Sequence, residues 1–542
     1  MSWPYDYIII GAGSAGSAIA NRLAEDYRLR ILILEAGPAD DSFLLKMPAG
    51  FASLGDKSPY NWRYETTPQT HCNNRRMYWP RGKTLGGSSA INAMLYVRGN
   101  AWDYDHWRQL GNEGWSYNDV LPFFKKAENN ERGGDQFHGA GGPLNVADQV
   151  DPLPINEAFL KAAEQSGHKR VTDFNGATQE GVGYYQVTQK DRRRWSTASA
   201  YLHPAVERNK NNVHVITNAQ VERIILDQNV AMGVRYRHKG QDEVARCSRE
   251  IILAGGAINS PQLLMLSGIG PADHLSSVGI RPLFDIPGVG GNLQDHLDAS
   301  ILQFCKTRDT YDTANKLMSL YKYWKDKKGP GTSPIAESGG FVSTRPGLSA
   351  PDVQFHFLPV MVVDHGRTQM KKNGYSLHVC TLRPESKGTI RLASKNPLAH
   401  PLIDANYLAE RADLDTLIAG VKMGREIFAQ SGLDPYRAAE LQPGAAVKTD
   451  AEIEQWIRAK CETIYHPVGT CKMGPDNDAM AVVDHQCRVR GIEGLRVVDA
   501  SVMPTLVGGN TNAPTIMIAE HVADWMQGKN AADEAAAKAK AA

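Results

Sequence analysis

The sequence predicts an α/β fold in which a doubly wound domain is interleaved with an α+β domain built on an antiparallel sheet. Three observations predict it. The chain opens on a strand, a glycine-rich turn and a helix; strand-like segments lie around residues 213–254; and residues 301–465 mix short strands with amphipathic helices. A chain of 542 residues, 42% of them hydrophobic, is long enough for two or more domains.

The first 35 residues predict a nucleotide-binding unit. Residues 5–10 are aromatic, acidic or β-branched and predict a strand, which ends at Gly11-Ala12-Gly13-Ser14-Ala15-Gly16. A helix over 17–25 and a strand over 31–34 complete a βαβ unit. In this G-x-G-x-x-G pattern the first glycine permits a tight turn, the second lets the backbone approach a pyrophosphate, and the third lets the helix pack on the strand. The unit is therefore predicted to be Rossmann-like.

Glu35 follows the second strand, 19 residues after Gly16. A carboxylate at this place accepts hydrogen bonds from a ribose diol and disfavours a 2′-phosphate, which argues against NADP. These residues alone leave NAD and FAD equally allowed.

Later segments follow the periods of strands and helices. Alternation predicts antiparallel strands at 213–216, 220–226 and 234–237, and an apolar run predicts a buried strand at 251–254. Further strands are predicted at 353–357, 376–382 and 389–392, and helices at 118–128, 155–165, 413–427, 450–458 and 515–523. Residues 530–542 are predicted to form a frayed end.

Charge and cysteine content exclude several function classes. With 60 Lys and Arg against 59 Asp and Glu, the net charge of +1 gives no basic field for nucleic acid, so a small-molecule partner is expected. Seven cysteines without a C-x-x-C pair predict neither a zinc cluster nor a disulfide framework, and no metal is expected. No export signal precedes the first strand, which predicts a cytoplasmic protein. Apolar runs are far shorter than the roughly 20 residues of a membrane span, so any membrane contact is peripheral.

Two long motifs carry a resemblance to a known family. The first is Gly82-Lys83-Thr84-Leu85-Gly86-Gly87-Ser88-Ser89-Ala90-Ile91-Asn92, continuing to Gly99, and the second runs from Gly256 to Gly270. Both match signatures of the glucose-methanol-choline (GMC) oxidoreductases, which the chain resembles over nearly its whole length, with the family's C-terminal motifs at 465–474 and 496–520.

The resemblance implies that the cofactor is FAD. A covalent histidyl link is not expected, because the position before the motif asparagine is Ile91, which has no nucleophile. FAD binding is expected from residues of the glycine turns, the second strand end and the C-terminal motifs: Gly11, Gly13, Ser14, Ala15, Gly16, Glu35, Ala36, Arg81, Gly86, Gly87, Ser88, Asn92, Ala93, Val221, Ala254, Gly255, Asp499, Ala500, Asn510, Asn512 and Thr515. The predicted FAD-binding domain comprises 1–160, 215–300 and 466–542, and the predicted substrate-binding domain 161–214 and 301–465.

The resemblance also implies the catalytic pair His466 and Asn510, both facing the flavin N5. Alcohol oxidation removes a hydroxyl proton and a hydride from one carbon, so a base of near-neutral pKa has to lie beside the oxygen. His466 supplies that base, and Asn510 can donate a hydrogen bond to the developing alkoxide, whereas flavin takes the hydride.

The substrate and the electron acceptor are less closely specified. Glu337 lies where choline-oxidising members of the family have a glutamate that neutralises the ammonium. Trp62 and Tyr465 could supply an aromatic cage beside it. The apolar segment 355–363 favours instead a neutral primary aliphatic alcohol. A quinone or other acceptor is expected, with peripheral contact at the inner face of the membrane. The alternatives are a choline dehydrogenase, an alcohol oxidase that uses O2, and a flavin-binding protein without redox turnover.

Overall fold

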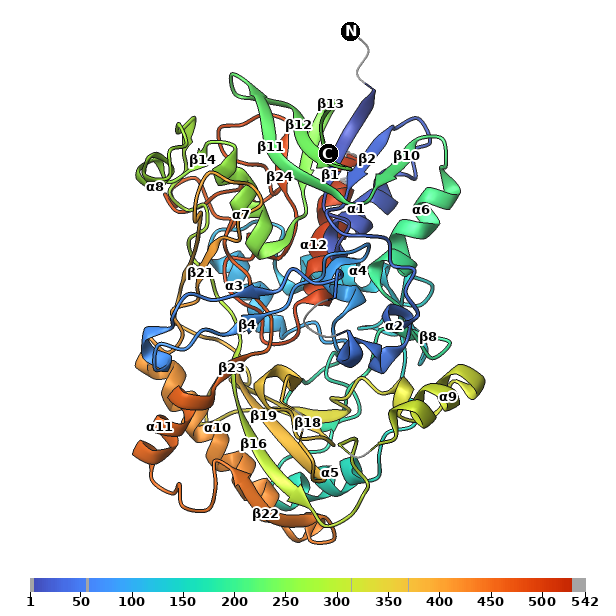
Figure 1. Cartoon of the computed structure of the whole chain (residues 1–542), viewed down its shortest axis with the longest axis vertical. Helices are drawn as coiled ribbons and strands as arrows, with labels where there is room; N and C mark the ends of the chain where they lie inside the picture. The colour runs from blue at the N-terminus through green and yellow to red at the C-terminus, as the bar shows by residue number, and fades with distance from the viewer. Residues whose placement is uncertain (1–3, 55–57, 313, 369, 529–542) are drawn as a thin grey trace, which may run out of the picture.

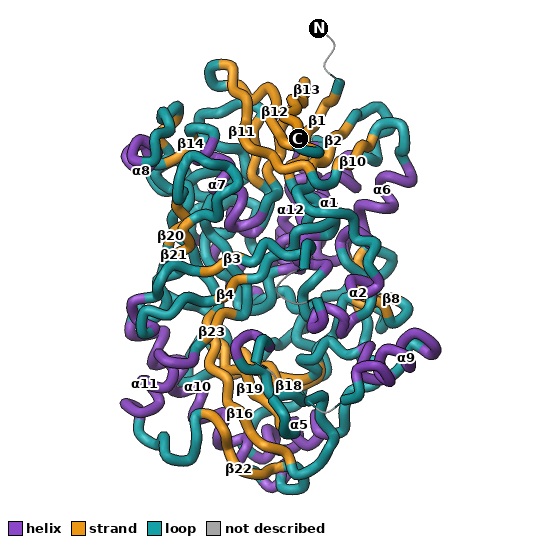
Figure 2. The backbone as a smooth tube through the Cα atoms, in the orientation of Figure 1, coloured by secondary structure: helices purple, strands orange, loops and turns teal. Residues whose placement is uncertain are grey.

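A computed structural model describes residues 4–54, 58–312, 314–368 and 370–528, so the predicted tail at 530–542 lies outside the described residues. Two seven-stranded sheets organise the chain, one in each half of the molecule (Figure 1). Loops occupy much of the space between the two sheets (Figure 2).

The first sheet has the strand order β10-β2-β1-β13-β12-β11, with β24 also paired to β13. Its strands are β1 (Tyr5–Ile10), β2 (Ile31–Leu34), β10 (Val213–Ile216), β11 (Ala219–Asp227), β12 (Val230–His238), β13 (Gln241–Leu253) and β24 (Leu495–Val497). The end of β13 lies parallel between β1 and β24, and its beginning pairs antiparallel with β12. β2 is buried at every residue, as expected for a parallel strand covered on both faces.

The prediction that 213–216 is an antiparallel strand was wrong. β10 runs parallel to β2, with Val213 opposite Ile31. It ends the strand order, and only Val213 of its four residues is buried. An edge strand is partly exposed whether it pairs parallel or antiparallel. The alternation of apolar and polar residues in the sequence could therefore not distinguish the two pairings.

Two helices from opposite ends of the chain lie side by side beneath this sheet. α1 (Ser14–Leu23) follows β1, and α12 (Asn512–Met526) is the last helix of the described residues (Figure 1). Arg22 forms an ion pair with the fully buried Glu520, with Nε 2.6 Å from Oε2. At their N-termini Ser14 Oγ donates to Asn512 Oδ1 over 2.7 Å. The glycine turn at residues 11–16 and the turn that ends at Asn512 are thereby held together.

The second sheet is antiparallel, with the order β22-β16-β19-β18-β17-β7 and β23 also paired to β16. Its strands are β7 (Gly181–Tyr184), β16 (Leu297–Cys305), β17 (Ser338–Val342), β18 (Val353–Leu358), β19 (Gly374–Thr381), β22 (Arg437–Gln442) and β23 (Glu462–Thr463). The predicted strand at 389–392 is β20 (Thr389–Arg391), which forms a separate pair with β21 (Leu402–Asp404). The predicted domain boundaries stay a prediction.

The other elements cover the sheets and line the space between them. The α-helices are α2 (Phe43–Lys46), α3 (Ala101–Gln109), α4 (Tyr117–Ala127), α5 (Ile155–Gln165), α6 (His203–Arg208), α7 (Gly256–Leu266), α8 (Ala272–Ser277), α9 (Lys316–Asp326), α10 (Arg411–Ala429) and α11 (Asp450–Lys460). Short strand pairs join β3 (Tyr64–Glu65) to β4 (Tyr78–Trp79), β5 (Glu128–Asn130) to β6 (Leu144–Val146), β8 (Gln189–Lys190) to β9 (Arg193–Arg194), and β14 (Ile269–Gly270) to β15 (Phe284–Asp285). In the described part of the chain, no helix combines the length and apolarity needed to cross a membrane.

Candidate active site

One cavity of about 1320 Å³ is lined by residues from both halves of the chain. Small-molecule pockets usually measure about 300–1,000 Å³, so this one has room for more than a substrate. The predicted cofactor residues line it except Gly16 and Gly86, the predicted catalytic pair lines it, and Glu337 does not.

The first glycine turn brings the N-terminus of α1 to the cavity. Gly13 is the N-cap of α1, and no side chain caps the helix there, so its first N–H groups are available to an anion. Gly16 packs behind the turn, because a Cβ on it would lie 2.0 Å from the Gly11 carbonyl oxygen. Gly86 holds the opposite loop by donating its N–H to the Ala12 carbonyl over 2.7 Å.

A second glycine lies across from the first turn. Gly87 begins the 3₁₀ helix η3 (Gly87–Ala90) with a φ of +51°, and a Cβ on it would lie 2.7 Å from Gly13 Cα. Both glycines line the cavity. Two backbone segments therefore approach each other here as only residues without a Cβ allow.

Glu35 is buried beyond the end of β2. Its carboxylate accepts backbone N–H groups from Ala12 and Gly37, each over 2.9 Å. Burial raises the pKa of Glu35 to about 7 despite these donors. Val221 of β11 lines the same cavity, so the residues predicted to hold a ribose and an adenine are on its wall together.

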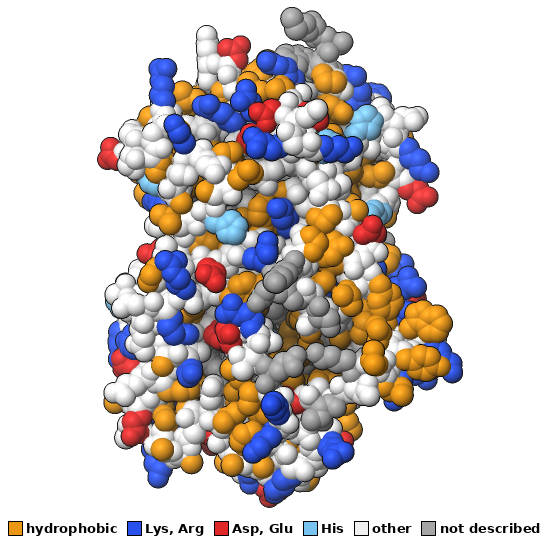
Figure 3. Space-filling model, viewed as in Figure 1, with side chains coloured by type: hydrophobic (Ala, Val, Ile, Leu, Met, Phe, Trp, Pro, Cys, Tyr) orange, Lys and Arg blue, Asp and Glu red, His pale blue; other side chains and the backbone are white. Residues whose placement is uncertain are grey.

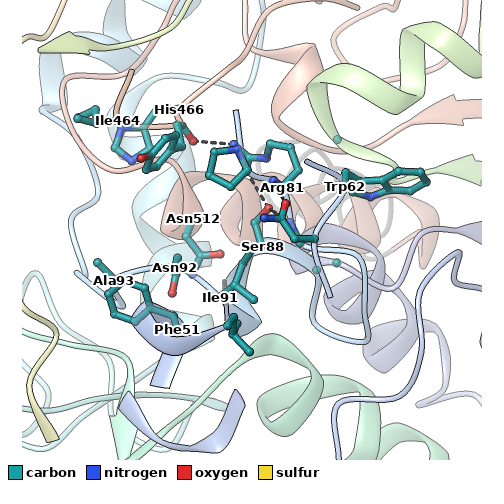
Figure 4. Close-up of a pocket in the computed structure, with 18 of the residues that line it drawn as sticks. Phe51, Trp62, Arg81, Ser88, Ile91, Asn92, Ala93, Ile464, His466 and Asn512 are labelled. Carbon is teal, nitrogen blue, oxygen red and sulfur yellow. Dashed lines mark hydrogen bonds between the residues drawn. The ribbon is translucent and has the colours of Figure 1, made fainter. Parts of the chain in front are cut away.

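Arg81 joins the first signature to the turn at Tyr465 and His466 (Figure 4). Its guanidinium donates to the Tyr465 carbonyl over 2.6 Å and to Ser88 Oγ over 2.9 Å. Tyr465 has a φ of +72°, a strained value for a residue with a side chain. The next residue, His466, donates its backbone N–H to Asp295 Oδ1 over 2.7 Å. These contacts fix the turn that presents His466.

Asp499 joins the second signature to the strand β24. Its carboxylate accepts from the Gly256 N–H over 2.8 Å, from Ser260 Oγ over 2.6 Å and from the Ser501 N–H over 2.8 Å. Asp499 is buried and lines the cavity beside Ala500. Its contacts therefore hold the start of α7 at the cavity wall.

The predicted catalytic pair is in direct contact. Asn510 Nδ2 lies 3.3 Å from His466 Nε2. On its other side, Asn510 Oδ1 lies 3.4 Å from Gln354 Nε2, which can only donate, so the Asn510 amide is oriented with its NH2 group toward His466. Both side chains line the cavity.

A second histidine fixes the tautomer of His466. His296 Nε2 lies 2.9 Å from the Leu382 carbonyl oxygen and has to donate to it, which leaves Nδ1 of the neutral ring as an acceptor. His466 Nδ1 lies 2.9 Å from that atom and is therefore the protonated nitrogen. The His466 lone pair is consequently on Nε2, beside Asn510.

The His466 ring is neutral. Burial lowers its pKa well below the ordinary value, and the neighbouring His296, His356 and Arg81 lower it further. Burial likewise lowers the pKa of His296 to about 3. A neutral imidazole with a free Nε2 lone pair can accept a proton from a hydroxyl group placed in the cavity.

Sequence reasoning missed His296, Gln354 and Asp295. No motif marks them as partners. Asp295 and His296 lie just before β16, Gln354 lies in β18, and only the tertiary fold brings them to the predicted catalytic pair. The only available signal was that Asp295 and His296, an acidic residue and a histidine, lie directly before a strand.

The structure does not bring Glu337, Trp62 and Tyr465 together as one site. The Glu337 carboxylate is buried and accepts from Tyr311, Ser333, Asn156 and the Leu153 N–H at 2.6, 2.7, 2.5 and 3.0 Å. Trp62 lines the cavity but stacks on Tyr64, with Lys83 Nζ 4.4 Å from its ring, and it lies on the far side of Arg81 from His466 (Figure 4). Tyr465 hydrogen-bonds His365 through its hydroxyl.

Three other carboxylates line the cavity, those of Asp298, Asp312 and Glu462, and none of them was singled out in the sequence. Asp298 of β16 and Glu462 of β23 are paired in register. Asp298 contacts His378 Nδ1, and although burial would lower the His378 pKa, the Asp298 carboxylate outweighs it and raises that pKa. Burial and the nearby Asp298 raise the pKa of Glu462 to about 7. The negative charge of this pair is therefore largely compensated.

Comparison with known proteins identifies the family. Residues 5–298 and 384–519 match the N-terminal and C-terminal models of the GMC oxidoreductases. The chain belongs to the GMC oxidoreductase family. It is 48% identical over 528 residues to an alcohol dehydrogenase (acceptor) of Pseudomonas putida, covering 96% of this chain and 95% of that protein. It is 47% identical over 539 residues to the mitochondrial choline dehydrogenase of Homo sapiens, covering 97% and 90%.

Solved structures of two oxidases have the same fold. Pyridoxine 4-oxidase from Mesorbium loti superimposes with a TM-score of 0.88 at 32% identity, covering 96% of this chain and 99% of that chain. A formate oxidase gives 0.90 at 26% identity, covering 97% and 98%. The family assignment confirms the predicted fold class, the FAD cofactor and, at the level of the family, the oxidation of alcohols.

The cavity of this GMC oxidoreductase fits FAD on its own geometry. Two helix N-termini without side-chain caps, those of α1 and α12, reach it, and they suit an anionic diphosphate and an electron-rich ring system. Gly13 and Gly87 both line the cavity, so this part of its wall is backbone without a Cβ, which a ligand can approach closely. Residues Gly11, Gly13, Glu35, Val221, Asn512 and Thr515 would hold the cofactor.

The flavin should be released by acid, because the residue before the motif asparagine is Ile91. This side chain lines the cavity beside Asn92 and cannot form a bond to the flavin (Figure 4). Precipitation of the yellow protein with acid should leave the colour in the supernatant. Colour that stays in the pellet after washing would contradict a non-covalent cofactor.

Proposed function

We propose that this protein oxidises a neutral primary aliphatic alcohol to the aldehyde, with His466 as the base and Asn510 as the hydrogen-bond donor to the alcohol oxygen. The observation that carries the proposal is the pair itself: His466 Nε2 has its lone pair beside Asn510 Nδ2, 3.3 Å away, at the cavity wall. FAD, when bound, supplies the acceptor for the hydride.

Each side chain has a separate task. His466 takes the hydroxyl proton at Nε2, and its Nδ1–H stays bonded to His296, so the positive charge formed on the ring is partly shared with a second imidazole. Asn510 donates toward the oxygen as negative charge develops there, a contribution of a few kcal/mol at most. Gln354 keeps the Asn510 amide in the orientation that can donate.

The lining of the substrate end supports a neutral substrate. Ile335, Leu358, Val360, Met361 and Val362 line the cavity, and they are apolar. Glu337 is the carboxylate that was predicted to bind an ammonium group. It already accepts four hydrogen bonds from the protein and does not line the cavity.

kcat/KM should rise with alkyl chain length from ethanol to octanol. Each buried methylene contributes up to about 0.8 kcal/mol, or about fourfold in kcat/KM. Glu337→Gln should keep this trend, because the side chain acts behind the cavity wall, although loss of a buried acceptor will lower the stability of the variant. Steady-state rates with a dye acceptor measure kcat/KM across the alcohol series for the unchanged protein and for the variant.

Choline is the second candidate, because Asp298 and Glu462 line the cavity. A choline site should lose at least tenfold in kcat/KM for choline in Glu462→Gln, since the cation would lose its carboxylate partner. Preference for choline over butanol and octanol, with collapse of activity in Glu462→Gln or Glu337→Gln, would overturn the neutral-alcohol proposal.

We further propose that electrons leave to a quinone or another acceptor and that neither NAD nor NADP is used. One glycine turn of the dinucleotide type is present near the N-terminus, and FAD accounts for it. The expected location is the cytoplasm, with peripheral contact at the inner face of the membrane, where a quinone is available.

A further inference from the structure

α9 has an apolar face that is turned to solvent. Leu317, Leu320, Tyr321 and Trp324 follow one another at helical spacings of three and four residues, and they are 79%, 38%, 52% and 67% exposed. Met318, beside them, is 51% exposed. Single exposed apolar residues are ordinary on a protein surface, whereas five on one helix of 11 residues are not.

The inward face of the same helix is formed by different residues. Tyr323 is 1% exposed and donates through its hydroxyl to the Arg192 carbonyl over 3.1 Å. Ser319, one turn earlier, lines the cavity. The helix is therefore anchored by Tyr323, whereas its apolar stripe is largely exposed.

Positive charge surrounds the apolar stripe. Residues 316–328 contain five lysines and one aspartate, although the whole chain carries a net charge of only +1. Lys322, Lys325 and Lys328 are exposed, and Lys325 Nζ lies 5.9 Å from the Tyr321 ring centre. Figure 3 shows apolar side chains gathered over α9 at the right edge of the molecule, with basic side chains next to them.

α9 also stands at the rim of the cavity. It packs against the 3₁₀ helix η5 (Gly329–Thr332), whose Pro330 and Gly331 line the cavity. Phe43, 43% exposed, continues the apolar surface, with its ring 5.9 Å from that of Tyr323. A surface that binds α9 would therefore contact an element of the cavity wall.

We propose that α9 docks on an anionic lipid bilayer, with Leu317, Leu320, Tyr321 and Trp324 in the interface and the lysines on lipid phosphates. A short helix with an apolar face, tyrosine and tryptophan, and flanking lysines has the chemistry of an interfacial helix. A second copy of the chain is a poorer occupant, because stable protein interfaces use roughly 20–30 residues a side and exclude lysine from their centres. The inference names the surface for the peripheral contact proposed above and does not depend on the substrate.

The test is flotation of the flavin-loaded protein with vesicles of phosphatidylcholine, alone or mixed with phosphatidylglycerol. The protein should float with the mixed vesicles, less at high salt, and Leu317→Gln/Trp324→Gln should bind at least about tenfold more weakly. Lys322→Gln/Lys325→Gln/Lys328→Gln should bind the mixed vesicles about 100-fold more weakly, from a contribution of about fivefold per lysine.

A matched control uses apolar residues of similar exposure elsewhere. Val244→Gln/Leu398→Gln replaces side chains that are 55% and 53% exposed, and it should bind as the unchanged protein does. Quenching of tryptophan fluorescence by brominated lipid should fall in Trp324→Phe, which keeps the apolar surface intact.

Two results would overturn the proposal. One is equal vesicle binding, or none, for the unchanged protein and for Leu317→Gln/Trp324→Gln. The other is a dimer in sedimentation that becomes a monomer in this variant without any vesicle binding, which would assign the face to a contact between copies. Flavin reduction by alcohol is measured separately in solution, so a failure of the proposed chemistry leaves the vesicle result interpretable.

Discussion

His466→Ala should slow the reduction of the bound flavin by alcohol roughly 10²–10⁴-fold, the usual contribution of a general base. The flavin content should not change, because the contacts predicted to hold the cofactor lie along the glycine turns, Glu35 and Val221. Anaerobic stopped-flow absorbance at saturating alcohol measures the rate, and the absorbance of flavin released from denatured protein measures the content.

Asn510→Ala is the comparison for this variant. It removes a hydrogen-bond donor and leaves the proton acceptor, so its rate should fall less than that of His466→Ala. Flavin reduction near the normal rate in His466→Ala would refute the assignment of the base.

Gly87→Ala should deplete the purified protein of FAD. The added Cβ would lie 2.7 Å from Gly13 Cα, where both residues line the cavity, so the two backbone segments would have to separate. Overpacking of this kind costs about 2 kcal/mol, which corresponds to about 30-fold weaker FAD binding. Flavin content after purification and a titration of the apoprotein with FAD measure the change.

Gly491→Ala is the matched control for the backbone strain. Gly491 also has a positive φ, +74°, but a Cβ on it would meet nothing within 4 Å. Both variants incur the same left-handed strain, about 1–2 kcal/mol, and only Gly87→Ala should lose flavin. Equal flavin content in the two variants would show that the contact between Gly87 and Gly13 does not shape the cofactor site.

Much of the fold follows from local patterns in the sequence. The glycine turn between β1 and α1 and the buried strand at the end of β13 have strong local signals, and the helices α5, α10 and α11 have clear amphipathic periods. The direction of β10 could not be predicted, because it depends on which strand becomes its neighbour. The pairing of β20 with β21 likewise depends on which strand becomes its neighbour in the folded chain.

Some residues of the candidate site could be predicted from the sequence, and others could not. Residues inside motifs, such as His466 and Asn510, could be named from the sequence, and the structure places them in contact. His296 and Gln354 could not, because their roles come from hydrogen bonds between segments 170 and 156 residues apart in the chain. Glu337 is the converse case. Its segment resembles an ammonium-binding segment of the family, but its buried carboxylate accepts hydrogen bonds from Asn156, Tyr311 and Ser333.

Anaerobic mixing of the yellow protein with primary alcohols tests the central claim most directly. The account predicts that octanol bleaches the flavin absorbance faster than butanol, that choline is slower than both, and that a quinone then restores the colour. A flavin that no alcohol reduces, choline included, would contradict the account and favour a flavin-binding protein without redox turnover.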